Sequence, residues 1–159
     1  AGIGADVLVG FPGETNELFN KTLIFLTELP ISYLHVFTYS ERPNTPAIEY
    51  DDSIEPRIRA ERSEVLRSLS ARKRQAFYMN ALGETLPVLF ETSSKAESTT
   101  GLTTNYIRVE TKSEQLLINE IRRVTIRGFD ENRCVGDICS QESGDDHRVH
   151  ISQTVSECS

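Results

Sequence analysis

The chain has 159 residues, a formal net charge of -7 and 38% apolar residues. This length suits one domain or two small ones. The acidic charge argues against a protein that coats nucleic acid, and no run approaches the roughly 18 apolar residues of a membrane span. Cys134, Cys139 and Cys158 match no trusted metal-ligand spacing, so we expect no metal site. The chain starts at Ala1 without a signal-peptide pattern, and we expect a cytoplasmic fragment of a longer protein.

A strand, a helix and a second strand are predicted near the start of the chain. Residues 5–11 contain a continuous apolar run, which is typical of a buried parallel strand. A Pro-Gly turn follows, Thr15 is a candidate N-cap, and Pro30 ends the helix. Residues 32–39 are rich in aromatic and β-branched side chains and predict the second strand. This order predicts two parallel strands with a right-handed crossover.

A basic helix is predicted after a Pro-rich, acidic loop over residues 40–55. Pro56 suits the first turn of a helix, apolar residues then recur at helical spacing, and Gly83 suits its end. Residues 54–82 hold 7 basic and 3 acidic side chains, the only segment with a basic excess. Such a face can bind phosphate groups, and the alternative is an ordinary solvated helix face.

Short β segments are predicted beyond Gly83, separated by a polar loop over residues 93–100. They cover residues 85–91, 105–110, 115–119 and 122–128. Short strands at this spacing favour a small closed barrel. From Asp130 onward the chain is acidic and Ser-rich, which predicts disorder. We therefore expect an α/β domain over 1–82, a β barrel over 83–129 and a disordered tail over 130–159.

Two motifs carry a family resemblance: GADVLVGFPGET at residues 4–15 and HVFTYSERPNTPA at residues 35–47. With the basic helix and the small β barrel, they make residues 1–129 resemble the last third of the radical-S-adenosylmethionine tRNA methylthiotransferases. The resemblance implies the last βα units of a TIM-like radical barrel, followed by a TRAM domain, a small RNA-binding β barrel. LHVFTYSERP looks most like the branch that acts on N6-threonylcarbamoyladenosine.

The resemblance implies that the full-length protein adds a methylthio group to C2 of N6-threonylcarbamoyladenosine beside the anticodon of tRNA. The implied cofactors are S-adenosylmethionine and 4Fe-4S clusters, and the implied partner is the tRNA anticodon loop. The chain departs from the family in lacking the C-x3-C-x2-C cluster motif, and Asn44 stands where relatives commonly carry Gly. We therefore assign no catalytic residue here and expect this chain alone to be inactive.

The resemblance also implies an adenosyl-binding site at the C-terminal ends of the two predicted strands. Its candidates are Gly10 and Phe11 at the first end, and Val36 and Phe37 at the second. Apolar side chains there would flank an adenine, while backbone groups would bind its edge. The alternative is that Gly10 only makes a tight turn and Phe37 belongs to the core.

Candidate RNA contacts combine cations with one aromatic side chain. They are Arg42, Arg72, Lys73, Asn105, Tyr106, Arg108 and Lys112. A stacking ring beside cations suits loop RNA, and helix arginines suit its phosphates. Tyr106 and Arg108 are expected to share one strand face. The alternatives are a core position for Tyr106 and a loop ion pair for Arg42 with Glu41 or Glu49.

Two other functions remain open from the sequence. One is a stand-alone RNA-binding TRAM module without catalysis, which tight tRNA binding by this chain alone would support. The other is a structural fragment without a ligand, which cooperative folding of residues 83–129 without RNA binding would support.

Overall fold

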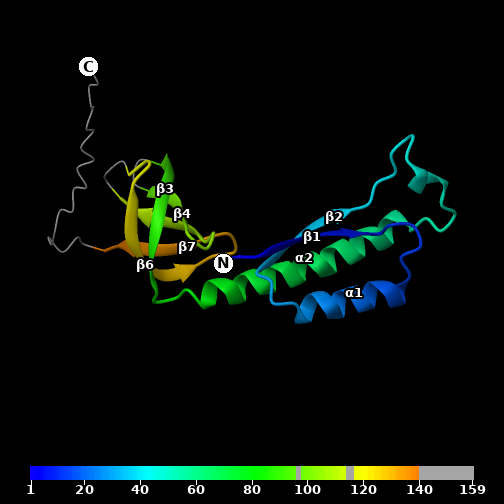
Figure 1. Ribbon diagram of the computed structural model, residues 1–159, viewed down its shortest axis with the longest axis horizontal. Coiled ribbons are helices and arrows are strands. Elements are labelled where there is room, and N and C mark those ends of the chain that lie inside the picture. The colour runs from blue at the N-terminus through cyan, green and yellow to red at the C-terminus, as the bar shows by residue number, and fades with distance from the viewer. Residues whose placement is uncertain (96–97, 114–116, 140–159) are drawn as a thin grey trace, which may run out of the picture.

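The computed structural model describes residues 1–95, 98–113 and 117–139. A β barrel lies at one end of an elongated molecule and an open α/β unit at the other, with one long helix joining them (Figure 1). Cys158 and the expected disorder of residues 140–159 lie outside the described residues. No helix in the described part is both long and apolar enough to cross a membrane.

The α/β unit contains β1 (Gly4–Val9), α1 (Asn16–Glu28) and β2 (Tyr33–Thr38). β1 and β2 pair in parallel, with Val9 opposite Thr38, which confirms the predicted strand–helix–strand unit. Thr15 caps α1, because its side-chain oxygen accepts a hydrogen bond from the Leu18 amide at 3.2 Å. β1 ends earlier than predicted because Gly10 takes a left-handed conformation with φ 81° and turns the chain.

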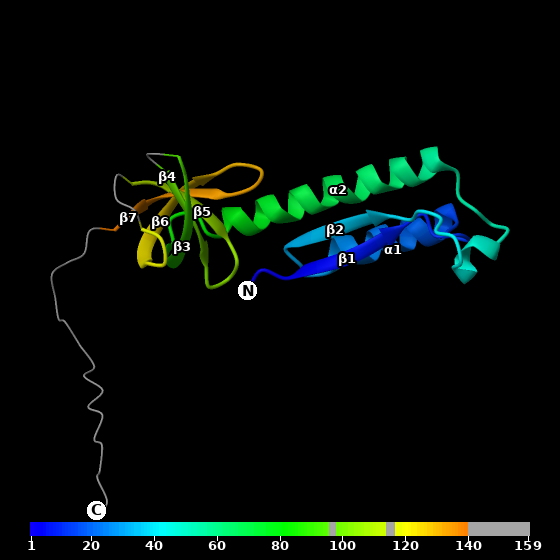
Figure 2. The ribbon, with the colours of Figure 1, turned by 90° about the horizontal axis from the view of Figure 1, so that it is seen from above.

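Helix α2 (Pro56–Met79) follows a loop that contains the short 3-10 helix η1 (Pro46–Glu49). It packs with α1 on one face of the β1–β2 sheet (Figure 2). The shared core holds Val9, Phe19, Leu26, Leu34, Leu66 and Leu69. On the other face, Leu8 and Phe37 lie opposite each other and are 52% and 54% exposed. The described part of the chain therefore covers only one face of this sheet.

The barrel is closed in the order β3-β4-β5-β7-β6, which confirms the prediction of a small closed barrel. Its strands are β3 (Thr85–Lys95), β4 (Ser98–Thr103), β5 (Arg108–Lys112), β6 (Ile121–Phe129) and β7 (Cys134–Ile138). Its core contains Val88, Phe90, Ile107, Val109, Leu117, Val124 and Ile126. Buried residues alternate with exposed or partly buried ones along β5 and β7, as in a strand with one buried face.

Four sequence expectations for the barrel were wrong. The polar segment 93–100 is not a loop in its described part, because β3 continues through Lys95 and β4 begins at Ser98. Residues 117–119 belong to no strand, and Asn105 and Tyr106 lie in the β4–β5 turn. The expected tail from residue 130 contains β7, which pairs with both β5 and β6 and closes the barrel. The composition of this segment did not predict β7, because β7 is stabilised by backbone pairing with neighbouring strands, which also cover its short inward side chains.

The end of α2 attaches the barrel to the α/β unit. Tyr78 lies in the barrel core, and its hydroxyl donates a hydrogen bond to the carbonyl oxygen of Asn132 at 3.0 Å. At the start of the chain, the Gly2 amide donates to the carbonyl oxygen of Asn105 at 2.9 Å. These contacts place the β4–β5 and β6–β7 turns against the α/β unit.

Candidate functional site

The C-terminal ends of β1 and β2 form an aromatic surface. Phe11 follows β1, is 39% exposed and meets the ring of Tyr39 edge-on, with centroids 5.2 Å apart. The ring of Tyr50 also meets Phe11 edge-on, with centroids 6.1 Å apart. Phe37 points to the uncovered face of the sheet, whereas the side chain of Val36 packs toward the helices. Val36 is one of the four residues expected at an adenosyl site. Its side chain points away from that surface, so Val36 could contact a ligand there only through its backbone.

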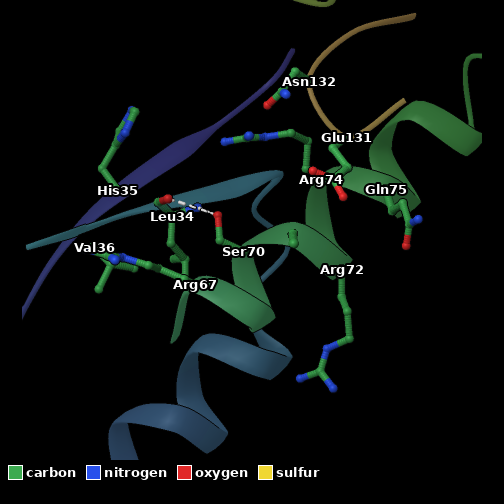
Figure 3. Close-up of a pocket in the computed structure, with 11 residues that line it drawn as sticks. Leu34, His35, Val36, Arg67, Ser70, Arg72, Arg74, Gln75, Glu131 and Asn132 are labelled. Carbon is green, nitrogen blue, oxygen red and sulfur yellow. Dashed lines mark hydrogen bonds between the residues drawn. The ribbon is translucent and has the colours of Figure 1, made fainter. Parts of the chain in front are cut away.

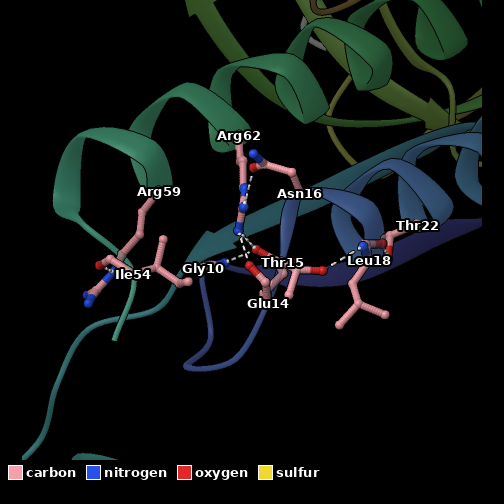
Figure 4. Close-up of polar contacts among 9 residues, drawn as sticks. All are labelled: Gly10, Glu14, Thr15, Asn16, Leu18, Thr22, Ile54, Arg59 and Arg62. Atoms are coloured by element: carbon pink, nitrogen blue, oxygen red, sulfur yellow. Dashed lines mark hydrogen bonds and ion pairs between the residues drawn. The ribbon is translucent and has the colours of Figure 1, made fainter. Parts of the chain in front are cut away.

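Two ion pairs hold the loops at these strand ends, and Figure 4 shows the one between Arg62 and Glu14. Arg62 pairs with Glu14 in the β1–α1 loop at 2.7 Å, and Arg59 pairs with Glu41 beyond β2. Sequence reasoning missed both arginines. The available signal was their spacing, because Arg59 and Arg62 continue the stripe of Leu66 and Leu69 that faces the sheet.

The Arg59–Glu41 pair gives one expected pH effect. The hydrogen bond from the Arg59 guanidinium is the main cause that lowers the pKa of Glu41 from 4.5 to about 2. Because folding lowers this pKa, the stability gained from the pair is present above about pH 4.5. It is lost as the pH falls to about 2. A carboxyl-carbon NMR titration should give a midpoint near the lowered value, and Arg59→Gln should return it toward 4.5. A wild-type midpoint near 4.5 would contradict the pair.

A cleft of about 510 Å³ lies between β2, α2 and the β6–β7 turn (Figure 3). We call it the arginine cleft; its lining includes His35, Arg67, Arg72, Arg74, Gln75, Glu131 and Asn132. Arg67 and Arg74 are seven residues apart on α2, and both extend toward β2, whereas Arg72 points to another side of the helix. Within the described residues, none of the three arginines forms an ion pair. The Arg74 guanidinium lies over the Tyr33 ring at 5.5 Å.

The chain is similar to known proteins over most of its length. No protein-family model matches it. It is 42% identical over 108 residues to the threonylcarbamoyladenosine tRNA methylthiotransferase MtaB of Aquifex aeolicus, which covers 68% of the chain and 25% of that protein. With MtaB of Bacillus subtilis the identity is 37% over 128 residues, 78% of the chain and 28% of the relative. The tRNA-2-methylthio-N(6)-dimethylallyladenosine synthase of Ehrlichia ruminantium is 34% identical over 135 residues, 83% of the chain and 30% of the relative.

The chain is homologous to a C-terminal part of the tRNA methylthiotransferases. This confirms the family that the two sequence motifs indicated. The chain spans between a quarter and a third of the length of these relatives. Both the threonylcarbamoyladenosine and the dimethylallyladenosine enzymes are among them.

An iron–sulfur cluster does not fit the described residues of this methylthiotransferase segment. Cys134 is buried in the barrel core, and burial raises the pKa of its thiol to about 11, opposite to what a thiolate ligand needs. Cys139 is the other cysteine in the described ranges. No group of three or more potential metal ligands occurs in the part of the chain that the structure describes.

The expected RNA contacts of the methylthiotransferase segment separate into three groups. Tyr106 is 72% exposed in the β4–β5 turn, so it is not a core residue, and with φ 65° it does not share a strand with Arg108. Arg108 and Lys112 are exposed on β5, on one face of that strand. Lys73 has a structural role instead, because its ammonium donates to the carbonyl oxygens of Thr27 and Leu29 at the end of α1.

Arg42 and Asn105 belong to none of these three groups. Arg42 is exposed, and among the described residues it forms no ion pair, because Glu41 binds Arg59 instead. Asn105 is half-buried, and its carbonyl oxygen is bonded to the Gly2 amide. Asn105 therefore fixes the turn that carries the exposed ring of Tyr106.

Proposed function

We propose that this chain is the part of a radical-S-adenosylmethionine tRNA methylthiotransferase that holds the adenosyl group and contacts the tRNA. In this proposal the α/β unit is the last βα portion of the radical barrel, and the closed β barrel is a TRAM domain. The single observation that carries it is the junction of the two units. There the arginine cleft lies beside the β6–β7 turn of the barrel, on a chain homologous to tRNA-modifying enzymes.

The RNA side of the proposal rests on charge and exposure. The whole chain is acidic, but Arg67 and Arg74 extend into the cleft without a carboxylate partner among the described residues. Phosphate groups are suitable ligands for such arginines. The β4–β5 turn that carries Tyr106 accepts a hydrogen bond from the Gly2 amide of the α/β unit, and Arg108 follows this turn, so in this proposal the cleft and the Tyr106 turn form one RNA surface with Arg108, Lys112 and Arg72. Arg42 lies in the loop before the start of α2, whereas the barrel packs on the end of α2, so Arg42 is outside this surface.

The cofactor side rests on the strand ends. S-adenosylmethionine, when bound, would supply the methyl group and the radical chemistry. Phe11 and Phe37 would provide apolar contacts to its adenine, and Gly10 and Val36 would offer backbone groups. In this proposal, 4Fe-4S clusters are bound by residues other than those that the structure describes. We propose N6-threonylcarbamoyladenosine beside the anticodon as the substrate, because threonylcarbamoyladenosine is part of the names of the MtaB relatives. We also propose that the protein acts in the cytoplasm.

A stand-alone RNA-binding module is the second candidate function. The observation that favours it is the mismatch between the described cysteines and a cluster. Addition of S-adenosylhomocysteine to the chain separates the two. The first candidate expects shifts in the amide NMR signals of Gly10 and Phe11, and the second expects none.

RNA binding tests the proposal directly. We expect a fluorescent anticodon stem–loop RNA to bind the chain with an affinity that falls steeply as salt rises. Tyr106→Ala should weaken binding roughly 5- to 150-fold, the range for loss of one base stack. Arg67→Gln with Arg74→Gln should lower the slope of log affinity against log salt by roughly 1.5. Arg57→Gln is the matched control, because Arg57 is exposed on α2 and paired with Glu61. Equal effects of all these variants, or no binding, would contradict the RNA surface.

A further inference from the structure

Helix α2 buries two charged side chains beneath the loops at the strand ends. Arg59 and Arg62 are 5% and 6% exposed. Burying a guanidinium is costly unless it is paired and its donors are satisfied. The partners of these two arginines therefore show what the buried charges are used for.

Arg62 organises the loop between β1 and α1. One guanidinium nitrogen donates to both the side chain and the backbone carbonyl of Glu14, each at 2.7 Å, and another donates to the Asn16 side chain at 2.8 Å. The same Glu14 oxygen accepts a hydrogen bond from the Gly10 amide at 2.8 Å. One side chain of α2 thus fixes both the start and the end of this loop (Figure 4).

Arg59 organises the longer segment after β2. Its donors reach the carbonyl oxygens of Ile54 at 2.6 Å and Tyr39 at 3.3 Å, the Ser53 hydroxyl at 3.0 Å, and the Glu41 carboxylate. It therefore ties the first residues of this segment to the last.

The two loops also meet each other through Arg59 and through a backbone bond. A Cβ atom on Gly10 would lie 2.5 Å from Cγ of Arg59, so the stem of Arg59 packs directly under the β1 loop. The Gly13 amide donates to the carbonyl oxygen of Asp52 at 2.9 Å, which joins the β1 loop to the segment after β2. Arg59 and Arg62 thus act on one connected structure.

We propose that Arg59 and Arg62 are positioning residues that hold both strand-end loops in place against α2. The same helix continues past the arginine cleft into the barrel core, so these loops are tied to the element that carries the RNA-side arginines. The use of the loops for an adenosyl ligand rests on the proposed function. Their attachment to α2 does not.

Hydrogen exchange of single amides, followed by NMR, tests this attachment. In Arg62→Gln and Arg59→Gln we expect the Gly10 and Gly13 amides to exchange at least tenfold faster than in the wild type. Amides of the barrel should change less than twofold, and amides of the β1–β2 ladder should be accelerated by a smaller factor than those of Gly10 and Gly13. Arg62→Lys should be intermediate, because an ammonium can pair with Glu14 but cannot also span to Asn16. Arg57→Gln, on the exposed side of α2, should leave all of these amides unchanged.

Two outcomes would overturn the proposal: unchanged exchange at Gly10 and Gly13, or acceleration by one common factor throughout the α/β unit. If Arg62→Gln does not fold, Arg62→Lys and Asn16→Ala supply the same comparison with smaller changes. S-adenosylhomocysteine titrations of the wild type and of Arg62→Gln test the proposed adenosyl site independently of the positioning role of the two arginines. Absence of binding to the wild type counts against the adenosyl site, while the exchange pattern alone decides the positioning role.

Discussion

Phe90→Ala should lower the free energy of unfolding of the barrel by about 3–5 kcal/mol. Phe90 is fully buried, and its ring lies in the core that all the strands of the closed sheet surround. Truncation leaves a cavity that this sheet cannot close, because the Phe90 backbone is bonded to Glu120 and Asn119. Urea unfolding followed through barrel amide signals would measure the loss.

Leu89→Ala is the matched control for the barrel. Leu89 is the neighbouring residue on β3, and it is 43% exposed on the outer surface. We expect its replacement to cost less than about 1.5 kcal/mol, because much of its side chain already contacts water. Similar losses for the two variants would mean that Phe90 does not fill the core of a closed barrel.

Glu14→Ala should destabilise the α/β unit by about 3–5 kcal/mol, because it leaves the buried Arg62 guanidinium without a carboxylate. The side chains of the pair are 7% and 17% exposed, so solvent cannot replace the lost partner well. Urea unfolding followed through β1 and β2 amide signals would measure the effect. Glu17→Ala is the control, because Glu17 forms an exposed pair with Lys21 that should contribute less than about 1 kcal/mol.

Replacing both partners separates the charge effect from simple loss of packing. Glu14→Ala combined with Arg62→Met should recover part of the lost stability, because no charge is then buried without a partner. Losses that simply add in the double variant would show that the Arg62–Glu14 contact is not a coupled ion pair.

The local order of the α/β unit could be predicted from sequence because each signal acts over a few residues. A Gly-bounded apolar run, Thr15 and Pro30 set β1 and α1, and Pro56 starts α2 as predicted. Successive side chains of a strand point to opposite faces of the sheet, so the alternation in β2 alone predicts that Val36 and Phe37 lie on opposite faces. Family motifs, rather than periodicity, led to both being placed at one site.

Long-range contacts explain what the sequence did not reveal. β7 is short and lies in an acidic segment, and it is a strand because β5 and β6 pair with it. The lysine at position 73 resembles its basic neighbours, but only the fold brings it to the end of α1. Arg59 and Arg62 likewise look like part of a solvated basic helix until the sheet and loops cover them. Basic composition alone therefore overstates the positive charge that α2 leaves exposed.

The most direct test of the RNA surface is ultraviolet crosslinking of the chain to an anticodon stem–loop RNA, with the attached residues located by mass spectrometry. We expect crosslinks at Tyr106 and in the peptides that carry Arg67 and Arg74, at the junction of α2 with the barrel. Crosslinks confined to other surfaces, with Tyr106 and the arginine cleft unmodified, would contradict the proposed role of this chain in binding tRNA.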